Sequence, residues 1–187
     1  ISEAFAHAVQ MRSQGWPAFP HHGIAEGKPI TKALLKEYIA YIRSFGIDVI
    51  PEIDVPGHAH ILTQVYPQFA CDVGDKPYNN WAMCIGTEET FTFIEDILTE
   101  ITEIFPYEYI HMGTDEIYMD DIDREPRITS CTCQCKVCNA RFLPMGFDTL
   151  LPRFYYFVDR VYNIINDLGK KMMMWNDQID ISNGAPE

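Results

Sequence analysis

Tyr109-Ile110-His111-Met112-Gly113-Thr114-Asp115-Glu116 passes from a short apolar run directly into two adjacent acids. The apolar part has the composition of a β-strand. α/β folds place catalytic groups at the carboxyl ends of parallel strands, whereas an isolated Asp-Glu pair more often marks a solvated turn or a helix start. The pair therefore becomes informative only if other segments of the chain share its design.

Two further segments do share it. Residues 49–58 read Val-Ile-Pro-Glu-Ile-Asp-Val-Pro-Gly-His, and residues 172–177 read Met-Met-Met-Trp-Asn-Asp. Each passes from an apolar run to polar or ionisable residues, and the carboxyl ends of parallel strands lie on one side of a sheet. The three segments therefore predict one site, with Glu116 as its candidate proton donor.

Helical patterns separate the strand-like segments. We expect helices over about 31–46, 87–106 and 152–169, each ending at a glycine or a proline. Their apolar faces are Leu34, Leu35, Tyr38, Ile42 and Phe45; Phe91, Ile94, Leu98, Ile101 and Phe105; and Phe154, Val158, Val161, Ile165 and Leu168.

Helix and strand alternate with a period of roughly sixty residues, which predicts right-handed crossovers and a parallel sheet. We expect the strands at about 48–53, 109–112 and 172–175. Three strands cannot close a (β/α)₈ barrel, which needs eight. The sequence therefore predicts either an open sheet or part of a larger barrel domain.

Composition narrows the class of protein. A chain of 187 residues with 47% hydrophobic content can bury the core of one domain. Its net charge of −13 argues against a nucleic-acid or anionic-membrane partner. We find no apolar run of the roughly 20 residues that span a bilayer, and no signal peptide. Since the sequence begins with Ile1, its natural start is expected to lie elsewhere, and secreted, periplasmic and cytoplasmic locations stay open.

Together the three segments resemble the glycoside hydrolase family 20 β-N-acetylhexosaminidases. Residues 46–59 resemble the family's third-strand block, G-I-x-V-I-P-E-I-D-x-P-G-H-A. Residues 109–116 resemble its H-x-G-G-D-E signature, and residues 168–175 resemble its fifth-strand block. The resemblance implies a (β/α)₈ TIM barrel, of which residues 1–187 form a partial catalytic domain from about the helix after strand two through strand five. A Cys-rich insertion at about 120–147 is not part of that pattern, and we expect the isolated chain to be inactive.

The resemblance also implies a reaction, the retaining hydrolysis of a terminal β-linked N-acetylhexosamine. The substrate's own acetamide oxygen would attack the anomeric carbon and form an oxazolinium intermediate. Glu116 would protonate the leaving oxygen and later activate water, while Asp115 would hold the acetamide N–H. The residues expected to bind substrate or support the acids are His58, Asp54, Trp175, Asp177 and His111.

Two positions depart from the family pattern. Thr114 stands where the family usually has a second Gly, and we expect it to fit only with a negative φ. Asp177 stands where a Glu is common. Two alternatives therefore stay open: a catalytically impaired carbohydrate-binding relative of the family, or another barrel glycosidase.

Cysteines form a second cluster at Cys131, Cys133, Cys135 and Cys138. The Cys135-x-x-Cys138 spacing is typical of zinc knuckles, so we predict a structural zinc site, with disulfides or free thiols as alternatives. A ligand from elsewhere in the chain is an option, because four ligands in so short a segment are cramped. Cys71 and Cys84 bracket an earlier loop and could pair with each other. No catalytic metal is expected, because the implied hydrolysis needs none.

Overall fold

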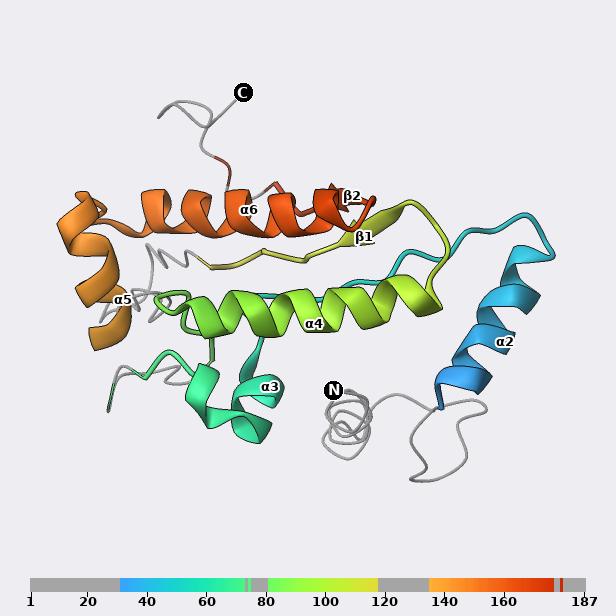
Figure 1. Ribbon diagram of the computed structural model, residues 1–187, viewed down its shortest axis with the longest axis horizontal. Coiled ribbons are helices and arrows are strands. Elements are labelled where there is room, and N and C mark those ends of the chain that lie inside the picture. Colours follow the sequence, from blue (N-terminus) through green and yellow to red (C-terminus); the bar gives the residue numbers. More distant parts are fainter. Residues whose placement is uncertain (1–30, 73, 75–80, 118–134, 177–178, 180–187) are drawn as a thin grey trace, which may run out of the picture.

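A computed structural model describes residues 31–72, 74, 81–117, 135–176 and 179 (Figure 1). The three predicted helices are present within a few residues of their expected bounds, whereas the four shorter helical elements were not predicted. In chain order the elements are α2 (Lys32–Arg43), α3 (His60–Val65), η1 (Pro67–Phe69), α4 (Glu88–Ile104), β1 (Tyr109–His111), α5 (Lys136–Phe142), η2 (Leu143–Met145), α6 (Leu150–Asp167) and β2 (Lys171–Met173).

The strands are parallel, as predicted. Ile110 pairs with Met172 in the β1–β2 register, and a parallel bridge joins Glu52 to His111 on the other side of β1. The backbone N–H of His111 also donates to Pro51 at 2.9 Å. The predicted strand at 48–53 is reduced to this single bridge, because Pro51 has no N–H with which to extend the ladder.

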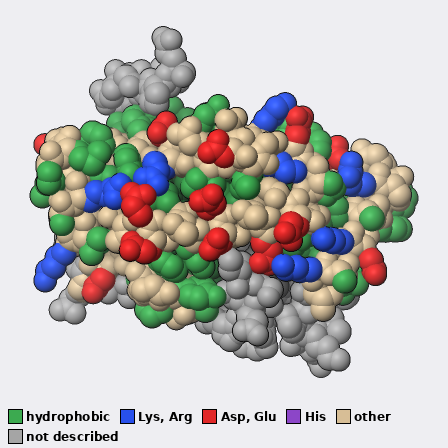
Figure 2. Space-filling model, in the orientation of Figure 1, with side chains coloured by type: hydrophobic (Ala, Val, Ile, Leu, Met, Phe, Trp, Pro, Cys, Tyr) green, Lys and Arg blue, Asp and Glu red, His purple; other side chains and the backbone are tan. Residues whose placement is uncertain are grey.

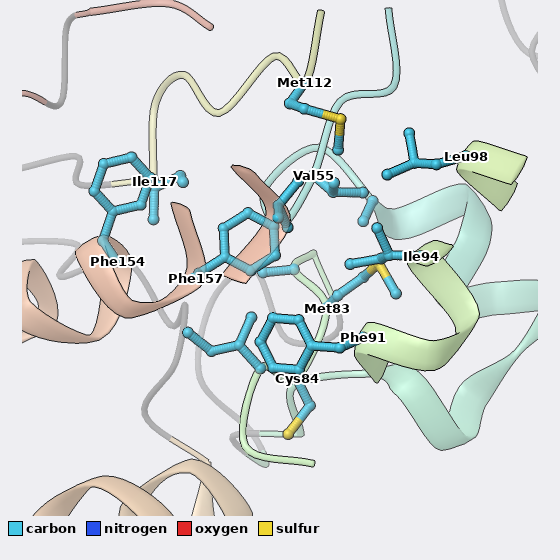
Figure 3. Packing of buried hydrophobic residues seen from close by; sticks show 14 of the residues in the cluster. Val55, Met83, Cys84, Phe91, Ile94, Leu98, Met112, Ile117, Phe154 and Phe157 are labelled. Carbon is cyan, nitrogen blue, oxygen red and sulfur yellow. The ribbon is translucent and has the colours of Figure 1, made fainter. Parts of the chain in front are cut away.

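Helices α4 and α6 run side by side along these strands (Figure 1). Thr87 is the N-cap of α4, and Glu88 and Glu89 occupy the first turn, where the helix dipole favours acids. Apolar side chains of both helices pack on the strand segments (Figure 3), and burying each contributes roughly 1.5–3 kcal/mol. The fully buried members include Phe91, Ile94 and Leu98 of α4, Phe157 and Ile165 of α6, and Val55, Ile110 and Met112 of the strand segments.

An ion-pair network fastens three helices at one end of this layer. Arg160 of α6 donates to Glu88 at 2.6 Å, and Arg141 of α5 reaches the same carboxylate at 2.5 Å. The hydrogen bond from Arg160 lowers the pKa of Glu88 to about 2. Elsewhere on this face acidic and basic side chains are interspersed (Figure 2), so the negative net charge is not gathered into one patch here.

Helix α2 lies at the edge of this core and contacts α4. Thr31 caps it as predicted, accepting from the backbone N–H of Leu34 at 3.1 Å. Ile39 is its buried residue, whereas Tyr38 and Phe45 of the predicted apolar face are exposed, because the described residues supply no layer to cover them. None of the described helices combines the length and the apolar composition that a bilayer crossing requires.

Candidate active site

The loops after the Glu52 bridge and after β1 touch at the carboxyl ends of the strands. A Cβ on Gly113 would lie 2.2 Å from Asp54 Oδ1 and 2.8 Å from the Cα of Asp54. The φ of Gly113 is +65°, in the left-handed region. Only glycine permits both the turn and the close approach, so this position brings the two loops into one site.

Both predicted acids face His58. The Nε2 atom of His58 lies 3.4 Å from Glu116 Oε2 and 3.7 Å from Asp115 Oδ2. These distances suit an ion pair, although no hydrogen bond is aligned at that nitrogen among the described residues. Strand alternation does not set the directions of the two acids, because the backbone leaves strand geometry at Gly113 and Glu116 has a φ of +54°.

Asp115 carries a buried oxygen that is ready to accept a hydrogen bond. No donor among the described residues reaches its Oδ1 atom. A buried carboxylate oxygen without a donor is costly, by roughly 1–3 kcal/mol or more. The atom is therefore suited to an N–H that a bound molecule supplies.

Asp54 lies behind this pair. Asp54, His58 and Asp115 each bring a polar atom within 4.8 Å of the others. Burial, followed by the charge of Asp115, raises the pKa of Asp54 to about 6, although His58 and the Thr114 N–H act in the opposite direction. The Thr114 N–H donates to Asp54 Oδ1 at 3.3 Å.

We expect the free energy of unfolding to fall as the pH rises from about 4 to about 6. In this window the native Asp54 carboxyl, with a pKa of about 6, holds a proton that the unfolded chain, with a pKa near 3.9, has lost. The stabilisation from Asp54 is complete at pH values below the pKa of the unfolded chain. It is lost as the pH rises through the pKa of the native carboxyl. Denaturant unfolding at closely spaced pH values measures it.

Asp54→Asn should flatten that part of the pH profile, because the amide oxygen still accepts from Thr114 but no longer titrates. The matched control is Asp48→Asn, at an exposed acid that pairs with Arg43 five residues earlier in the chain. An unchanged slope in Asp54→Asn would assign the pH dependence to another group.

Thr114 contradicts the expectation of a negative φ. Its φ is +71°, a genuine outlier for a β-branched residue, and the side chain is fully buried. Its hydroxyl donates to the Gly113 carbonyl at 2.5 Å, which holds the residue in place. Packing and this hydrogen bond therefore hold Thr114 in a conformation whose backbone strain is about 1–3 kcal/mol.

We expect Thr114→Gly to raise the free energy of unfolding by about 1 kcal/mol, because relief of strain exceeds the lost hydrogen bond. Thr114→Val is the control: it keeps the branched side chain and the strain but removes the hydroxyl, and should lower stability. Denaturant unfolding of the parent and the two variants measures their order of stability. A glycine variant that is less stable than the parent would contradict the prediction.

One wall of the site consists of His111, Glu52 and Trp175. His111 Nδ1 accepts from the Gly113 N–H at 3.0 Å, which places its proton on Nε2 in the neutral ring. Glu52 lies 3.4 Å from the same Nδ1, a pairing that requires a proton on that nitrogen, so the shorter backbone bond describes the tautomer with its proton on Nε2. Trp175 donates from Nε1 to Glu52 at 3.1 Å, stacks obliquely on His111 and stays exposed. Trp175 is thus not a core aromatic of this chain.

Trp81 forms a wall that the sequence did not predict. Its ring meets that of His58 edge-on, with the ring centroids 4.8 Å apart. A Cβ on Gly57 would lie 2.8 Å from the Trp81 ring, so the Pro-Gly-His turn depends on this contact. No local motif surrounds Trp81, and only its tertiary position identifies it.

The described cysteines include only half of the predicted quartet. Cys71, Cys84, Cys135 and Cys138 converge and are buried, and none of the four forms a disulfide, so the pairing of Cys71 with Cys84 was wrong. The predicted quartet was drawn from neighbours in sequence, whereas two of the observed partners come from the preceding loop. Cys131, Cys133 and Asp177 lie outside the described residues.

Known proteins share this architecture. Residues 10–187 match the family described as glycosyl hydrolase family 20, catalytic domain. A β-hexosaminidase subunit A1 of Dictyostelium discoideum is 32% identical over 94% of this chain and 31% of its own length. A β-hexosaminidase of Akkermansia muciniphila is 39% identical over 52% of this chain and 20% of its own length. The crystal structure of a β-N-acetylhexosaminidase from Bacteroides fragilis is 27% identical and superposes with a TM-score of 0.65 over 84% of this chain and 30% of that one. The chain thus spans about a third or less of the length of these proteins.

Proposed function

Since the chain belongs to the glycosyl hydrolase family 20 catalytic domains, we propose that the protein carrying it removes terminal β-linked N-acetylhexosamine from glycans or oligosaccharides. The fold is part of the family's (β/α)₈ barrel: consecutive parallel strands with α4 and α6 as the intervening outer helices. The reaction is retaining and substrate-assisted.

One observation carries the proposal: a buried Asp115 oxygen that no donor of the described residues reaches lies beside an exposed Glu116, and both acids lie within 4 Å of His58 Nε2. An acetamide N–H is the donor that Asp115 Oδ1 requires. Hydrolysis of a sugar without that group would leave the buried oxygen unpaired.

Each acid then has its own task. Glu116 gives its proton to the leaving oxygen while the acetamide oxygen attacks the anomeric carbon and the glycosidic bond breaks. Asp115 orients the acetamide and stabilises the positive charge of the oxazolinium ring. Glu116, now ionised, takes a proton from water, which opens the ring with retention of configuration.

The remaining predicted residues support these two. His58 and Asp54 set the charge around the acids, and His111 fixes the Gly113 turn that positions them. Trp175 offers an exposed aromatic face to the sugar, and Asp177 is proposed as a partner for a sugar hydroxyl. The partner is a carbohydrate, in keeping with a net charge of −13 that disfavours nucleic acid.

Family 20 hydrolysis needs no catalytic cofactor, because the substrate provides the nucleophile and Glu116 the proton. A structural zinc is a separate proposal, and its ligands are the buried cysteines rather than the acids.

The test compares an N-acetyl-β-glucosaminide with the matching β-glucoside, together with inhibition by N-acetylglucosamine-thiazoline, a mimic of the oxazolinium ring. We expect turnover of the first substrate only, and tight thiazoline binding. Equal turnover of both sugars would favour another barrel glycosidase. Sugar binding without turnover would favour the impaired relative.

A further inference from the structure

The four buried cysteines lie where two loops meet, next to but outside the candidate active site. Cys71 and Cys84 belong to the loop region that follows the Glu52 bridge, and Cys135 and Cys138 belong to the region that follows β1. We propose that these four thiolates bind one structural Zn²⁺, which fastens the two loops to each other. Neither the hydrolytic reaction nor its acids enter into this proposal.

Five of the six sulfur–sulfur distances are short enough for one metal site. Cys84 Sγ lies 3.5 Å from Cys135 Sγ and 3.6 Å from Cys138 Sγ. The sulfurs of Cys71, Cys135 and Cys138 lie within 4.8 Å of one another. Zinc–sulfur bonds of about 2.3 Å at tetrahedral angles give sulfur–sulfur edges of about 3.8 Å, whereas a disulfide needs about 2.05 Å.

Backbone hydrogen bonds hold the first pair of cysteines, Cys71 and Cys84, in place. An antiparallel bridge joins Ala70 to Met83, the Cys71 N–H donates to Ala82, and the Cys84 N–H donates to Phe69. Side chains alternate across such a ladder, so both cysteines project from the face opposite Ala70 and Met83. In Figure 3 the Cys84 sulfur points away from the packed rings.

The second pair of cysteines, Cys135 and Cys138, has the geometry of a zinc knuckle. Cys135 is the N-cap of α5, and its sulfur accepts from the Cys138 N–H at 3.4 Å. Such N–H···S bonds neutralise part of the charge of a thiolate and orient it toward the metal. The C-x-x-C spacing therefore forms a two-ligand unit that needs two ligands from elsewhere.

Gly86 lets the two pairs come together. A Cβ at this position would lie 2.8 Å from the Cys138 backbone nitrogen and 2.9 Å from its Cα. The Thr90 hydroxyl donates to the Cys84 carbonyl at 2.6 Å and fixes the same turn to the start of α4. The close approach is thus set by the backbone and does not depend on side-chain rotamers.

Burial and charge also favour a cation. All four side chains are at most 4% exposed, so an ion bound among their sulfurs would be shielded from solvent. Each sulfur that binds Zn²⁺ releases its proton to solvent, and the metal offsets the charge that is left.

The experiment measures zinc by mass spectrometry in the complete protein carrying this chain, purified without added metal. We expect one zinc per chain, lost in Cys84→Ser and Cys135→Ser and kept in the matched controls Cys131→Ser and Cys133→Ser. Cobalt substitution of the parent should give the absorption bands of a tetrahedral thiolate complex, a readout that does not depend on variants folding.

Three results would overturn the proposal. A parent protein without zinc that also fails to take up cobalt would do so, as would zinc loss in the Cys131 or Cys133 variants with retention in the Cys84 variant. The third is a disulfide at any of the four positions, found by alkylation and mass measurement without reductant. Hydrolytic activity is not the readout, so failure of the zinc proposal and of the hydrolase proposal are distinguishable.

Discussion

Glu116→Gln is expected to lower kcat by about 10²- to 10⁴-fold on an N-acetyl-β-glucosaminide whose leaving group is the hydroxyl of a second sugar, with little change in KM. The amide has the shape of the acid but no proton to give. Glu116 is the exposed member of the pair, 3.4 Å from His58, so it can reach a leaving oxygen at the mouth of the site. Steady-state kinetics in the complete protein measures the loss.

A second substrate tests whether proton donation is the step that Glu116→Gln impairs. A substrate with an acidic phenol as its leaving group needs little protonation, so Glu116→Gln should cost it much less. The matched control is Glu108→Gln, the same substitution at an exposed acid that pairs with Lys171 beside the amino end of β1. Equal losses on both substrates would remove the proton-donor role from Glu116.

Asp115→Asn is expected to lower kcat/KM for N-acetyl-β-glucosaminides by about 10²- to 10³-fold, through loss of charge beside the oxazolinium ring. The buried Oδ1 atom has no donor among the described residues, so the acetamide N–H is its proposed partner. Replacement by Asn keeps the volume but removes the negative charge. Kinetics with N-acetylated and N-trifluoroacetylated substrates should show a weakened dependence on the acetamide.

Thiazoline inhibition separates this role from a general loss of structure. Its inhibition constant should rise in Asp115→Asn by a factor comparable with the loss in kcat/KM. Asp96→Asn, at an exposed position of α4, is the control and should leave both quantities unchanged. Unchanged thiazoline affinity in Asp115→Asn would contradict the acetamide-holding role.

Elements with a local physical cause were predictable from the sequence. The helical spacing of Phe91, Ile94 and Leu98 needs only a core on one side, and all three are buried as expected. The parallel direction of β1 and β2 followed from the helix between them. The two acids were recognisable because they follow a strand directly, and the structure places both of them near Nε2 of the predicted His58.

Features that depend on contacts between distant segments were not predictable. Trp81 belongs to the site only because the Gly57 turn packs against it, and the φ of Thr114 is positive only because its buried surroundings hold it there. The bounds of the first strand were overestimated, since apolar composition does not report which backbone groups find partners.

The sequence by itself determined the family, the helix–strand alternation and the identity of the two acids, because each is encoded within one continuous segment. The tertiary structure decided which groups meet: Asp54 behind Asp115, Trp81 beside His58, and Cys71 and Cys84 with Cys135 and Cys138. Spacing along the chain constrains neighbours on one helix or strand. Only the packed backbone, with glycines at its closest approaches, sets distances between residues about 50 positions apart.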